Sequence, residues 1–304
     1  MKRRQILKVD GLMLRFGGLQ VLNDLSLTVR EGQIVGLIGP NGAGKTSCFN
    51  CLTGIYQPQG GRVLFDGRDV SALPTHRRAK LGMARTWQNL GVIDSLTVTE
   101  NVMLAQHQRA GYSALAGMLG LAGTWHRERE LRRDAAEIIE YFGLEDVADE
   151  RTGSLPYGVR KTCDMAMALA TDPRMLLLDE PASGLSPEEA LGLADTLREL
   201  RDRLKLTILM IEHHVPLVAE VCDYVYVLNF GELLTEGRPE EIQRHPEVIA
   251  AYLGGAAVET GATEDRETEA APDDTIQFEP GEDTAPPPEW PLRAGAKGDG
   301  DGPA

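Results

Sequence analysis

The chain has 304 residues, of which 42% are hydrophobic and 5% aromatic, so it holds enough apolar material for one large core or two modest ones, and disorder throughout is excluded. Lys and Arg number 31 against 46 Asp and Glu, a formal net charge of −15. That sign argues against binding nucleic acid. Four scattered cysteines and a start without an apolar stretch predict a cytoplasmic protein without disulfides. No apolar run approaches the roughly 18 to 20 residues of a membrane span, so any work at a membrane is expected from outside the lipid.

Short segments that alternate apolar and polar residues predict an antiparallel sheet near the amino terminus, at residues 7–9, 12–16, 25–29 and 62–65. Compact, branched runs bounded by turn residues are typical of parallel strands buried on both faces. These runs alternate with helical patterns, which indicates an α/β fold, and they lie at residues 33–38, 175–178, 206–211 and 224–228. Between residues 99 and 172 the pattern is mostly helical, so we expect a helical subdomain inserted into the core.

A glycine-rich loop follows the first of these buried strands. Residues 39–46, Gly-Pro-Asn-Gly-Ala-Gly-Lys-Thr, fit the pattern G-x-x-x-x-G-K-[ST] between a predicted strand and a helical stretch. Glycines there let backbone N–H groups converge on phosphate oxygens, and the helix N-terminus adds a positive dipole. Lys45 is expected to reach the β- and γ-phosphates and the Thr46 hydroxyl to face Mg²⁺.

Cys48 and Cys51 lie one turn apart on the helix after this loop, and we expect them to pack in the core rather than bind metal. Arg77 and Arg78 are predicted to form a solvated helix face.

A second buried strand ends in two acids, at residues 175–180, Met-Leu-Leu-Leu-Asp-Glu. Asp179 is expected to hold Mg²⁺, directly or through water, and Glu180 to polarise a water for attack on the γ-phosphate. Together with the glycine-rich loop, these acids predict a P-loop NTPase.

One helix start is marked strongly in the sequence. Ser186, Pro187 and Glu189 have the types of an N-cap, an N1 proline and a capping-box acid. The leucines that follow share one helix face, which is expected to pack on the sheet, at positions 193, 197, 200 and 204.

The composition changes at residue 255. The segment 255–304 holds seven of the 17 prolines, and from Gly254 onward 13 acidic residues face three basic ones, so it is predicted to be disordered. The expected organisation is therefore a nucleotide-binding domain at 1–254, with the helical subdomain at about 99–172, and an acidic Pro-rich tail at 255–304.

Further motifs, in chain order, make the sequence similar to ATP-binding cassette (ABC) ATPases. Gln88 in Arg-Thr-Trp-Gln-Asn resembles their Q-loop, and Leu155, Pro156, Tyr157 and Gly158 resemble their signature motif. Residues 183–186 resemble the D-loop, and His213, after the strand at 206–211, resembles the switch histidine. Phe16 stands where this family keeps an aromatic that stacks on adenine. The resemblance covers roughly residues 5–253 and implies a RecA-like core with an antiparallel β-subdomain and a helical subdomain.

More closely, the chain resembles the ATPase subunits of branched-chain amino acid importers, in an insertion at 108–126 and in segments 12–18, 50–54, 85–88, 100–107, 155–158, 211–213 and 251–254. This implies an ATP-hydrolysing, energy-coupling subunit of an importer for branched-chain or other hydrophobic amino acids. Relatives that import urea, amides or other small solutes have similar sequences. The implied partners are a second ABC ATPase subunit, identical or distinct, multi-span permease subunits and, indirectly, a solute-binding protein. The implied location is peripheral, on the cytoplasmic face of the cell (inner) membrane.

In this family two ATPase subunits face each other, and each signature motif completes the partner's phosphate loop. The resemblance assigns catalysis to Glu180 and His213, and Mg²⁺ to Thr46, Gln88 and Asp179. The residues that it assigns to ATP are Phe16, Gly39, Pro40, Asn41, Gly42, Ala43, Gly44, Lys45, Thr46, Ser47 and Gln88.

The sequence departs from the family pattern at three positions. Pro156 replaces the usual signature serine and has neither a hydroxyl nor a backbone N–H, Val159 replaces the usual glutamine, and Ser186 replaces an aspartate of the D-loop. Because the signature serves the partner's nucleotide, we hypothesise that a heterodimer's opposite site is the weakened one, whereas the site on this chain's own phosphate loop is competent.

Three alternatives stay open. A soluble ABC ATPase acting on the ribosome or DNA generally has two cassettes, a coiled coil or a basic surface, whereas this sequence has one cassette, no heptads and a negative charge. A regulatory nucleotide-binding module without turnover would need neither Glu180 nor His213. Within the transporters, an exporter is the remaining alternative.

Overall fold

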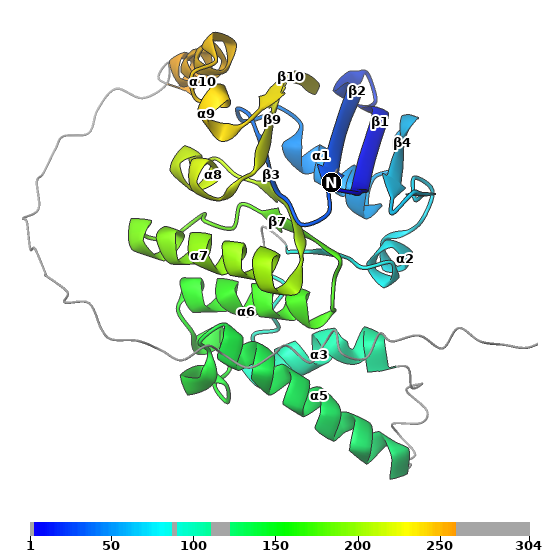
Figure 1. Ribbon diagram of the computed structural model, residues 1–304, viewed down its shortest axis with the longest axis vertical. Helices are drawn as coiled ribbons and strands as arrows, with labels where there is room; N and C mark the ends of the chain where they lie inside the picture. Colours follow the sequence, from blue (N-terminus) through cyan, green and yellow to red (C-terminus); the bar gives the residue numbers. More distant parts are fainter. Residues whose placement is uncertain (1–2, 87–89, 111–121, 260–304) are drawn as a thin grey trace, which may run out of the picture.

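The computed structural model describes residues 3–86, 90–110 and 122–259. As predicted, the fold is α/β, with a four-stranded antiparallel sheet beside a six-stranded sheet that is parallel except at one edge (Figure 1). Gln88 and residues 260–304 of the predicted tail lie outside the described residues.

The smaller sheet has the order β2-β1-β4-β5. Its strands are β1 (Gln5–Phe16), β2 (Leu19–Arg30), β4 (Gly60–Phe65) and β5 (Arg68–Asp69). The predicted segments 7–9 and 12–16 belong to one strand, because the pairing with β2 shifts register between Val9 and Leu12 and the chain continues. A bulge of this kind breaks the apolar alternation without ending the strand.

The larger sheet contains all four predicted buried strands side by side. In spatial order its strands are β10 (Glu232–Gly237), β9 (Tyr224–Asn229), β3 (Ile34–Ile38), β8 (Thr207–Ile211), β7 (Met175–Asp179) and β6 (Met83–Arg85). The two edge strands of this sheet were not predicted from the sequence. β6 has three residues, too few for a pattern, and β10 has largely half-exposed side chains.

The two faces of the larger sheet carry separate cores. Side chains such as Val35 and Leu37 pack with helix α1 (Lys45–Thr53) and the antiparallel sheet. Ile34 and Ile38 point the other way, into a core formed with helices α7 (Pro187–Leu204) and α8 (Val215–Val221). Successive side chains of a strand point to opposite faces, and both faces of this sheet are buried. The strands are therefore continuous apolar runs in the sequence. Cys48 and Cys51 are fully buried in the first core, as predicted.

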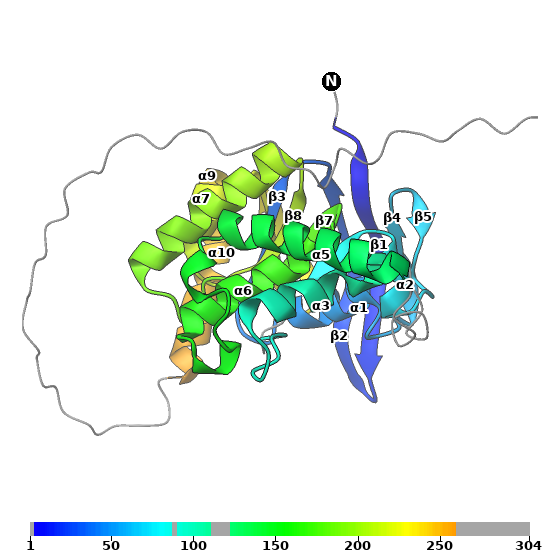
Figure 2. The same ribbon diagram turned by 90° about the horizontal axis from the view of Figure 1, so that it is seen from below.

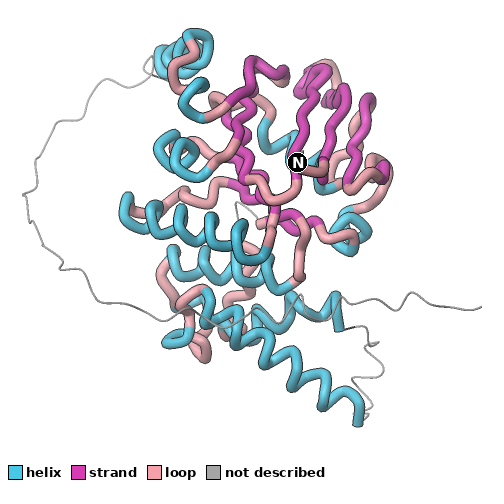
Figure 3. Tube along the Cα trace, in the orientation of Figure 1, coloured by secondary structure: helices cyan, strands magenta, loops and turns pink. Residues whose placement is uncertain are grey.

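The predicted helical subdomain is present, below the sheets in Figure 1 and in front of them in Figure 2, where the molecule is seen from below. It packs a third apolar core between its helices, which are α3 (Val98–Ala110), α5 (Ala122–Tyr141) and α6 (Tyr157–Ala170), with short 3₁₀ turns at Glu145–Val147 and Thr152–Ser154. Figure 3 shows the strands gathered apart from this helical layer. Residues 111–121 of the predicted insertion lie outside the described part of the chain.

The start of α7 follows the prediction. Ser186 accepts from the backbone N–H of Glu189, whose carboxylate accepts in turn from Ser186 N. The four leucines at 193, 197, 200 and 204 are buried against the sheet.

The prediction for Arg78 is wrong. It lies on helix α2 (Thr75–Lys80) and is 1% exposed. Its guanidinium donates to the carbonyls of Ser71, Cys51, Leu52 and Leu73 at 2.6 to 2.8 Å. It thus satisfies the carbonyls at the C-terminal end of α1, where a cation is favoured.

The C-terminal helix runs past the predicted domain boundary. After α9 (Pro239–Ile242), α10 spans Pro246–Glu259, so residues 255–259 are helical rather than part of a tail. The run Ala-Ala-Val-Glu at 256–259 has the composition to continue a helix that has already formed. Within the described ranges, no helix combines the length and the apolar character required to cross a bilayer.

Candidate functional site

The glycine-rich loop joins the carboxyl end of β3 to the amino end of α1. Gly39 and Gly44 have φ of +151° and +98°. A Cβ at Gly39 would lie 2.1 Å from the Leu228 carbonyl oxygen, and one at Gly44 would lie 2.9 Å from the Val21 carbonyl oxygen. Only glycine fits at these two positions, which lets the loop pass close to β9 and β2.

Lys45 opens α1 and is buried under the loop. Its Nζ donates to the carbonyls of Gly39 at 2.7 Å and Pro40 at 2.9 Å. Burial lowers the pKa of Lys45 to about 8, although the carboxylates of Glu180 and Asp179 act in the opposite direction. An anion entering the loop therefore meets an ammonium whose charge it would stabilise.

The two predicted acids end β7 at the same edge of the sheet. Asp179 is 3% exposed, and its Oδ2 accepts from Arg85 Nη2 at 2.7 Å. Glu180 is half-buried and has a φ of +49°, with its N–H donating to the carbonyl of Ile211 at 3.0 Å. This left-handed turn directs the Glu180 side chain away from the strand, at a cost that functional sites commonly carry.

His213 follows β8 and meets Glu180. Nε2 of His213 lies 3.2 Å from Oε1 of Glu180. Both side chains line a cavity of about 390 Å³ whose floor is the glycine-rich loop. Its lining residues are Leu19, Gln20, Val21, Asn41, Gly42, Ala43, Gly44, Lys45, Thr46, Ser47, Glu180, His213 and Phe230.

Phe16 is not in the described lining of this cavity, although it pairs with Leu19, which is. Its ring is 47% exposed and packs edge-on against Tyr56, with ring centroids 5.1 Å apart. The cavity lining instead includes Leu19 and Phe230, which the sequence analysis did not single out.

The predicted signature residues lie elsewhere, at the start of α6. Leu155 is buried in the helical subdomain, whereas Pro156 and Tyr157 are exposed and Gly158 is half-buried. Pro156 is the N-cap residue and makes no side-chain capping bond. None of the four residues lines the described phosphate-loop cavity of the same chain.

Lys161 connects α6 to the residues that follow β7. Its Nζ donates to the carbonyls of Glu180 at 2.6 Å and Ser183 at 2.8 Å. Burial lowers the pKa of Lys161, and the carboxylates of Glu212, Glu180 and Asp164 partly oppose this shift.

Two buried residues that the sequence analysis missed hold this edge together. Arg85 bridges Asp179 to α1, where its Nη1 donates to Asn50 Oδ1 at 2.7 Å. The Glu212 carboxylate accepts from three backbone N–H groups, those of Ala182 at 2.7 Å, His213 at 2.8 Å and His214 at 3.0 Å. Glu212 directly follows the apolar run at residues 206–211. A charged residue next to such a run is the sequence signal that could have identified Glu212 as a buried, hydrogen-bonded carboxylate.

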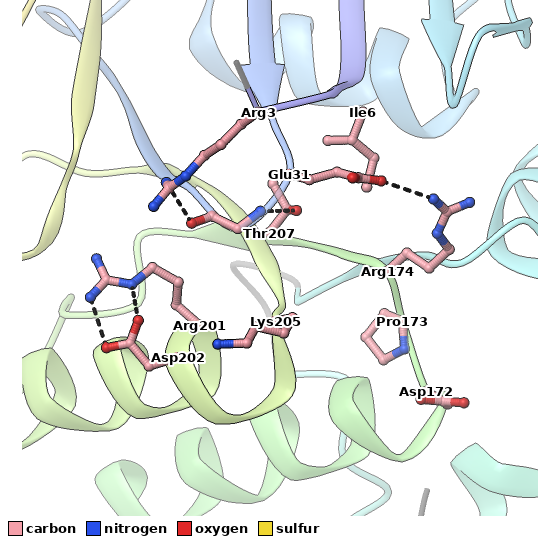
Figure 4. A pocket seen from close by; sticks show the side chains of 11 residues that line it. Arg3, Ile6, Glu31, Asp172, Pro173, Arg174, Arg201, Asp202, Lys205 and Thr207 are labelled. Carbon is pink, nitrogen blue, oxygen red and sulfur yellow. Dashed lines mark hydrogen bonds and ion pairs between the residues drawn. The ribbon is translucent and has the colours of Figure 1, made fainter. Parts of the chain in front are cut away.

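A larger cavity, of about 630 Å³, lies at the opposite, amino ends of the strands (Figure 4). Its arginines are engaged in local contacts: Arg174 with Glu31 at 3.3 Å, Arg201 with Asp202 at 2.8 Å, and Arg3 with the Gly32 carbonyl at 3.0 Å. Since no predicted chemical residue lines it, the phosphate-loop cavity is the candidate site.

A metal site made by the protein alone is absent from the described residues, which hold no cluster of three His, Cys, Asp or Glu side chains suited to an ion.

Comparison with known proteins identifies the family. The family model described as ABC transporter matches residues 22–183, and that described as branched-chain amino acid ATP-binding cassette transporter matches residues 232–258. The chain is 44% identical over 253 residues to the high-affinity branched-chain amino acid transport ATP-binding protein BraF of Pseudomonas aeruginosa, covering 83% of this chain and 99% of that protein. It is 43% identical over 251 residues to the corresponding protein LivG of Salmonella typhimurium, covering 83% and 98%.

The fold agrees with this relationship. The crystal structure of an ATP-binding cassette of an ABC transporter in its ADP conformation superimposes with a TM-score of 0.72 at 30% identity, covering 82% of this chain and 99% of that one. The chain belongs to the ATP-binding subunits of ABC transporters, a family of ATPases.

Proposed function

We propose that this chain hydrolyses ATP at the cavity above its phosphate loop and thereby powers an importer of branched-chain or other hydrophobic amino acids. The observation that carries the proposal is the 3.2 Å approach of His213 Nε2 to Glu180 Oε1 within a cavity floored by residues 41–47. A loop that binds phosphates and an acid beside a histidine are the parts needed to position a water in line with a γ-phosphate.

Each residue of this site then has a chemical role. The loop N–H groups and Lys45 hold the phosphates, Glu180 orients and polarises the attacking water, and His213 hydrogen-bonds the γ-phosphate and that water. Water attacks the γ-phosphorus and ADP leaves, so the products are ADP and phosphate.

Thr46, which lines the cavity, and Asp179, which lies outside the described lining with its Oδ2 accepting from Arg85 Nη2 at 2.7 Å, are proposed to hold a Mg²⁺ ion. Both offer oxygen donors, which this ion prefers, and Mg²⁺ usually takes its remaining ligands from substrate phosphates and water. When bound, the ion neutralises phosphate charge. Gln88 is proposed as a third ligand on its sequence alone.

The catalytic roles are tested by a pair of neighbouring histidines. His213→Ala should lower kcat by roughly 100-fold or more while ATP still binds, since general acid–base and positioning groups contribute about that much. His214→Ala is the matched control, because His214 is exposed and is not in the lining of this cavity. Glu180→Gln should likewise bind ATP without turnover. Equal kcat for the two histidine variants would contradict the proposal.

The solute is proposed from the relatives, whose names specify branched-chain amino acids. Cells that lack this protein should lose uptake of radiolabelled leucine, isoleucine and valine. Wild-type protein should restore uptake and Glu180→Gln should not. If leucine uptake is normal and urea or amide uptake is lost, the solute class is the alternative one.

We further propose that the chain works on the cytoplasmic face of the inner membrane, bound to permease subunits and a second ATPase. Purification of Glu180→Gln with ATP from detergent-solubilised membranes should recover multi-span proteins and that second ATPase. Recovery of ribosomal or DNA-repair proteins instead would refute the transport role.

Pro156 is proposed to weaken the nucleotide site of the partner. It starts α6 without a side-chain capping bond, and it can offer a phosphate neither a hydroxyl nor a backbone N–H. In a reconstituted heterodimer, Glu180→Gln in this chain should abolish most turnover, and the equivalent change in the partner much less. Equal losses from the two variants would exclude the asymmetry.

A further inference from the structure

The turn between β9 and β10 places an aromatic residue in an unfavourable conformation. Asn229 pairs with Glu232, which leaves Phe230 and Gly231 as a two-residue hairpin turn with φ of +46° and +82°. Positive φ at both central residues is the mark of a type I′ turn, for which Asn-Gly is the favoured sequence. A bulky L-residue is strained in this left-handed conformation.

This turn is fixed to the phosphate loop. Gly231 N donates to the carbonyl of Ala43 at 3.0 Å, and the carbonyl of Gly231 accepts from Asn23 N at 2.9 Å. A Cβ on Gly231 would lie 2.3 Å from the carbonyl oxygen of Val21. The turn therefore cannot shift without moving the loop or β2, so the position of the Phe230 backbone is set relative to the phosphate loop.

The ring of Phe230 contributes little to the core. It is 87% exposed, the highest value among the large apolar side chains of the described residues. The other non-glycine residues with positive φ in that part of the chain are aspartates, Glu180 and Lys205, so Phe230 is the one apolar side chain held in this conformation.

The exposed ring faces the cavity above the phosphate loop. Leu19, Val21 and Phe230 line that cavity together with residues 41–47. The part of the cavity formed by residues 41–47, with the Lys45 ammonium, is suited to phosphates. The part formed by Leu19, Val21 and Phe230 is apolar. In a nucleotide, the part adjacent to the phosphates is the nucleoside, whose base has an uncharged aromatic face that can stack on an aromatic side chain.

We infer that Phe230 is a binding residue for the nucleoside of the bound nucleotide, where its ring packs on the ribose and base opposite Leu19. This inference rests on the proposed ATP binding. Contact with the nucleotide covers a ring that water otherwise surrounds, and it gives a physical reason for an aromatic residue in a turn that favours asparagine.

The test uses a substitution that suits the turn better than the native residue does. Phe230→Asn should keep or raise the melting temperature, because asparagine tolerates the left-handed conformation. It should weaken ATP binding roughly tenfold, within the range of base–aromatic contacts. Binding of inorganic tripolyphosphate, which has no nucleoside, should change less than about twofold. Phe230→Tyr should bind ATP like the wild type.

Leu191→Ala is the control for loss of an exposed apolar side chain, since Leu191 is 56% exposed on α7. It should leave both affinities unchanged.

Unchanged ATP affinity in Phe230→Asn would overturn the inference, whether turnover is normal or reduced. If turnover were reduced at unchanged affinity, the ring would instead contact a protein partner. Equal weakening of ATP and tripolyphosphate would also overturn it, because the effect would then lie in the phosphate loop. Failure of the proposed function gives a different result, in which the wild type binds neither compound.

Discussion

The affinity for ATP should fall as the pH rises above 8, through Lys45. Burial lowers the pKa of Lys45 to about 8 in the free protein, whereas phosphates at the loop should restore a pKa near or above the ordinary lysine value of about 10.4. The bound state then holds more protons than the free state, so binding takes up a proton and is weakened by rising pH.

The magnitude follows from the two pKa values. Between pH 7.5 and 9.5 the protonated fraction of free Lys45 falls from roughly three quarters to about 3%, whereas the lysine stays protonated in the complex. The dissociation constant should therefore rise roughly twentyfold over this range. At pH 8.5, binding should take up about 0.75 proton.

Isothermal titration calorimetry in buffers of different ionisation enthalpy measures both quantities, with Glu180→Gln as the background that prevents turnover. Lys45→Arg is the matched control, because arginine keeps its charge throughout this range; its affinity should be lower but independent of pH. A wild-type affinity that is constant from pH 7.5 to 9.5, or that falls in parallel with the arginine variant, would refute the reasoning.

Three further predictions concern stability and positioning. Arg85→Met leaves the Asp179 carboxylate, 2.7 Å away in the wild type, buried without this partner, and should cost roughly 3–5 kcal/mol in urea unfolding; addition of Asp179→Asn should recover part of the loss. Glu212→Gln places an amide group among three N–H donors, so kcat should fall at an unchanged dissociation constant for ATP, and unchanged kcat would contradict a positioning role. Gly192→Ala on exposed helix surface, where a Cβ meets nothing within 4 Å, should stabilise by about 0.5–1 kcal/mol in the same assay, and any destabilisation would argue against the helix geometry described.

Much of the fold could be predicted from local pattern. The strands at 33–38, 175–178, 206–211 and 224–228 are buried on both faces, so each is a continuous apolar run between turns, and the structure confirms all four in one sheet. The capping box at Ser186 is equally local and is present. The phosphate loop could be located because its glycines are required by close backbone contacts, as at Gly39 and Gly44.

The features that were missed depend on contacts between distant parts of the chain. Arg78 and Arg85 look like surface charges in sequence, but their partners lie up to 94 positions away and include backbone carbonyls, which sequence does not mark. β6 exists because its three residues pair with β7. Phe230 lies in a turn that nothing local connects with the phosphate loop, and only the pairing of Gly231 with Ala43 brings them together.

The two bonds of Lys161 have a mechanical consequence. Its Nζ holds the carbonyls of Glu180 and Ser183, so a force that displaces the exposed start of α6, at Pro156 and Tyr157, is carried along the helix into the backbone of the acid that faces the phosphate loop. The first turns of α6 and the residues after β7 are therefore mechanically connected through the Lys161 side chain. A partner that displaces the start of α6 is therefore expected to move the backbone of Glu180 as well.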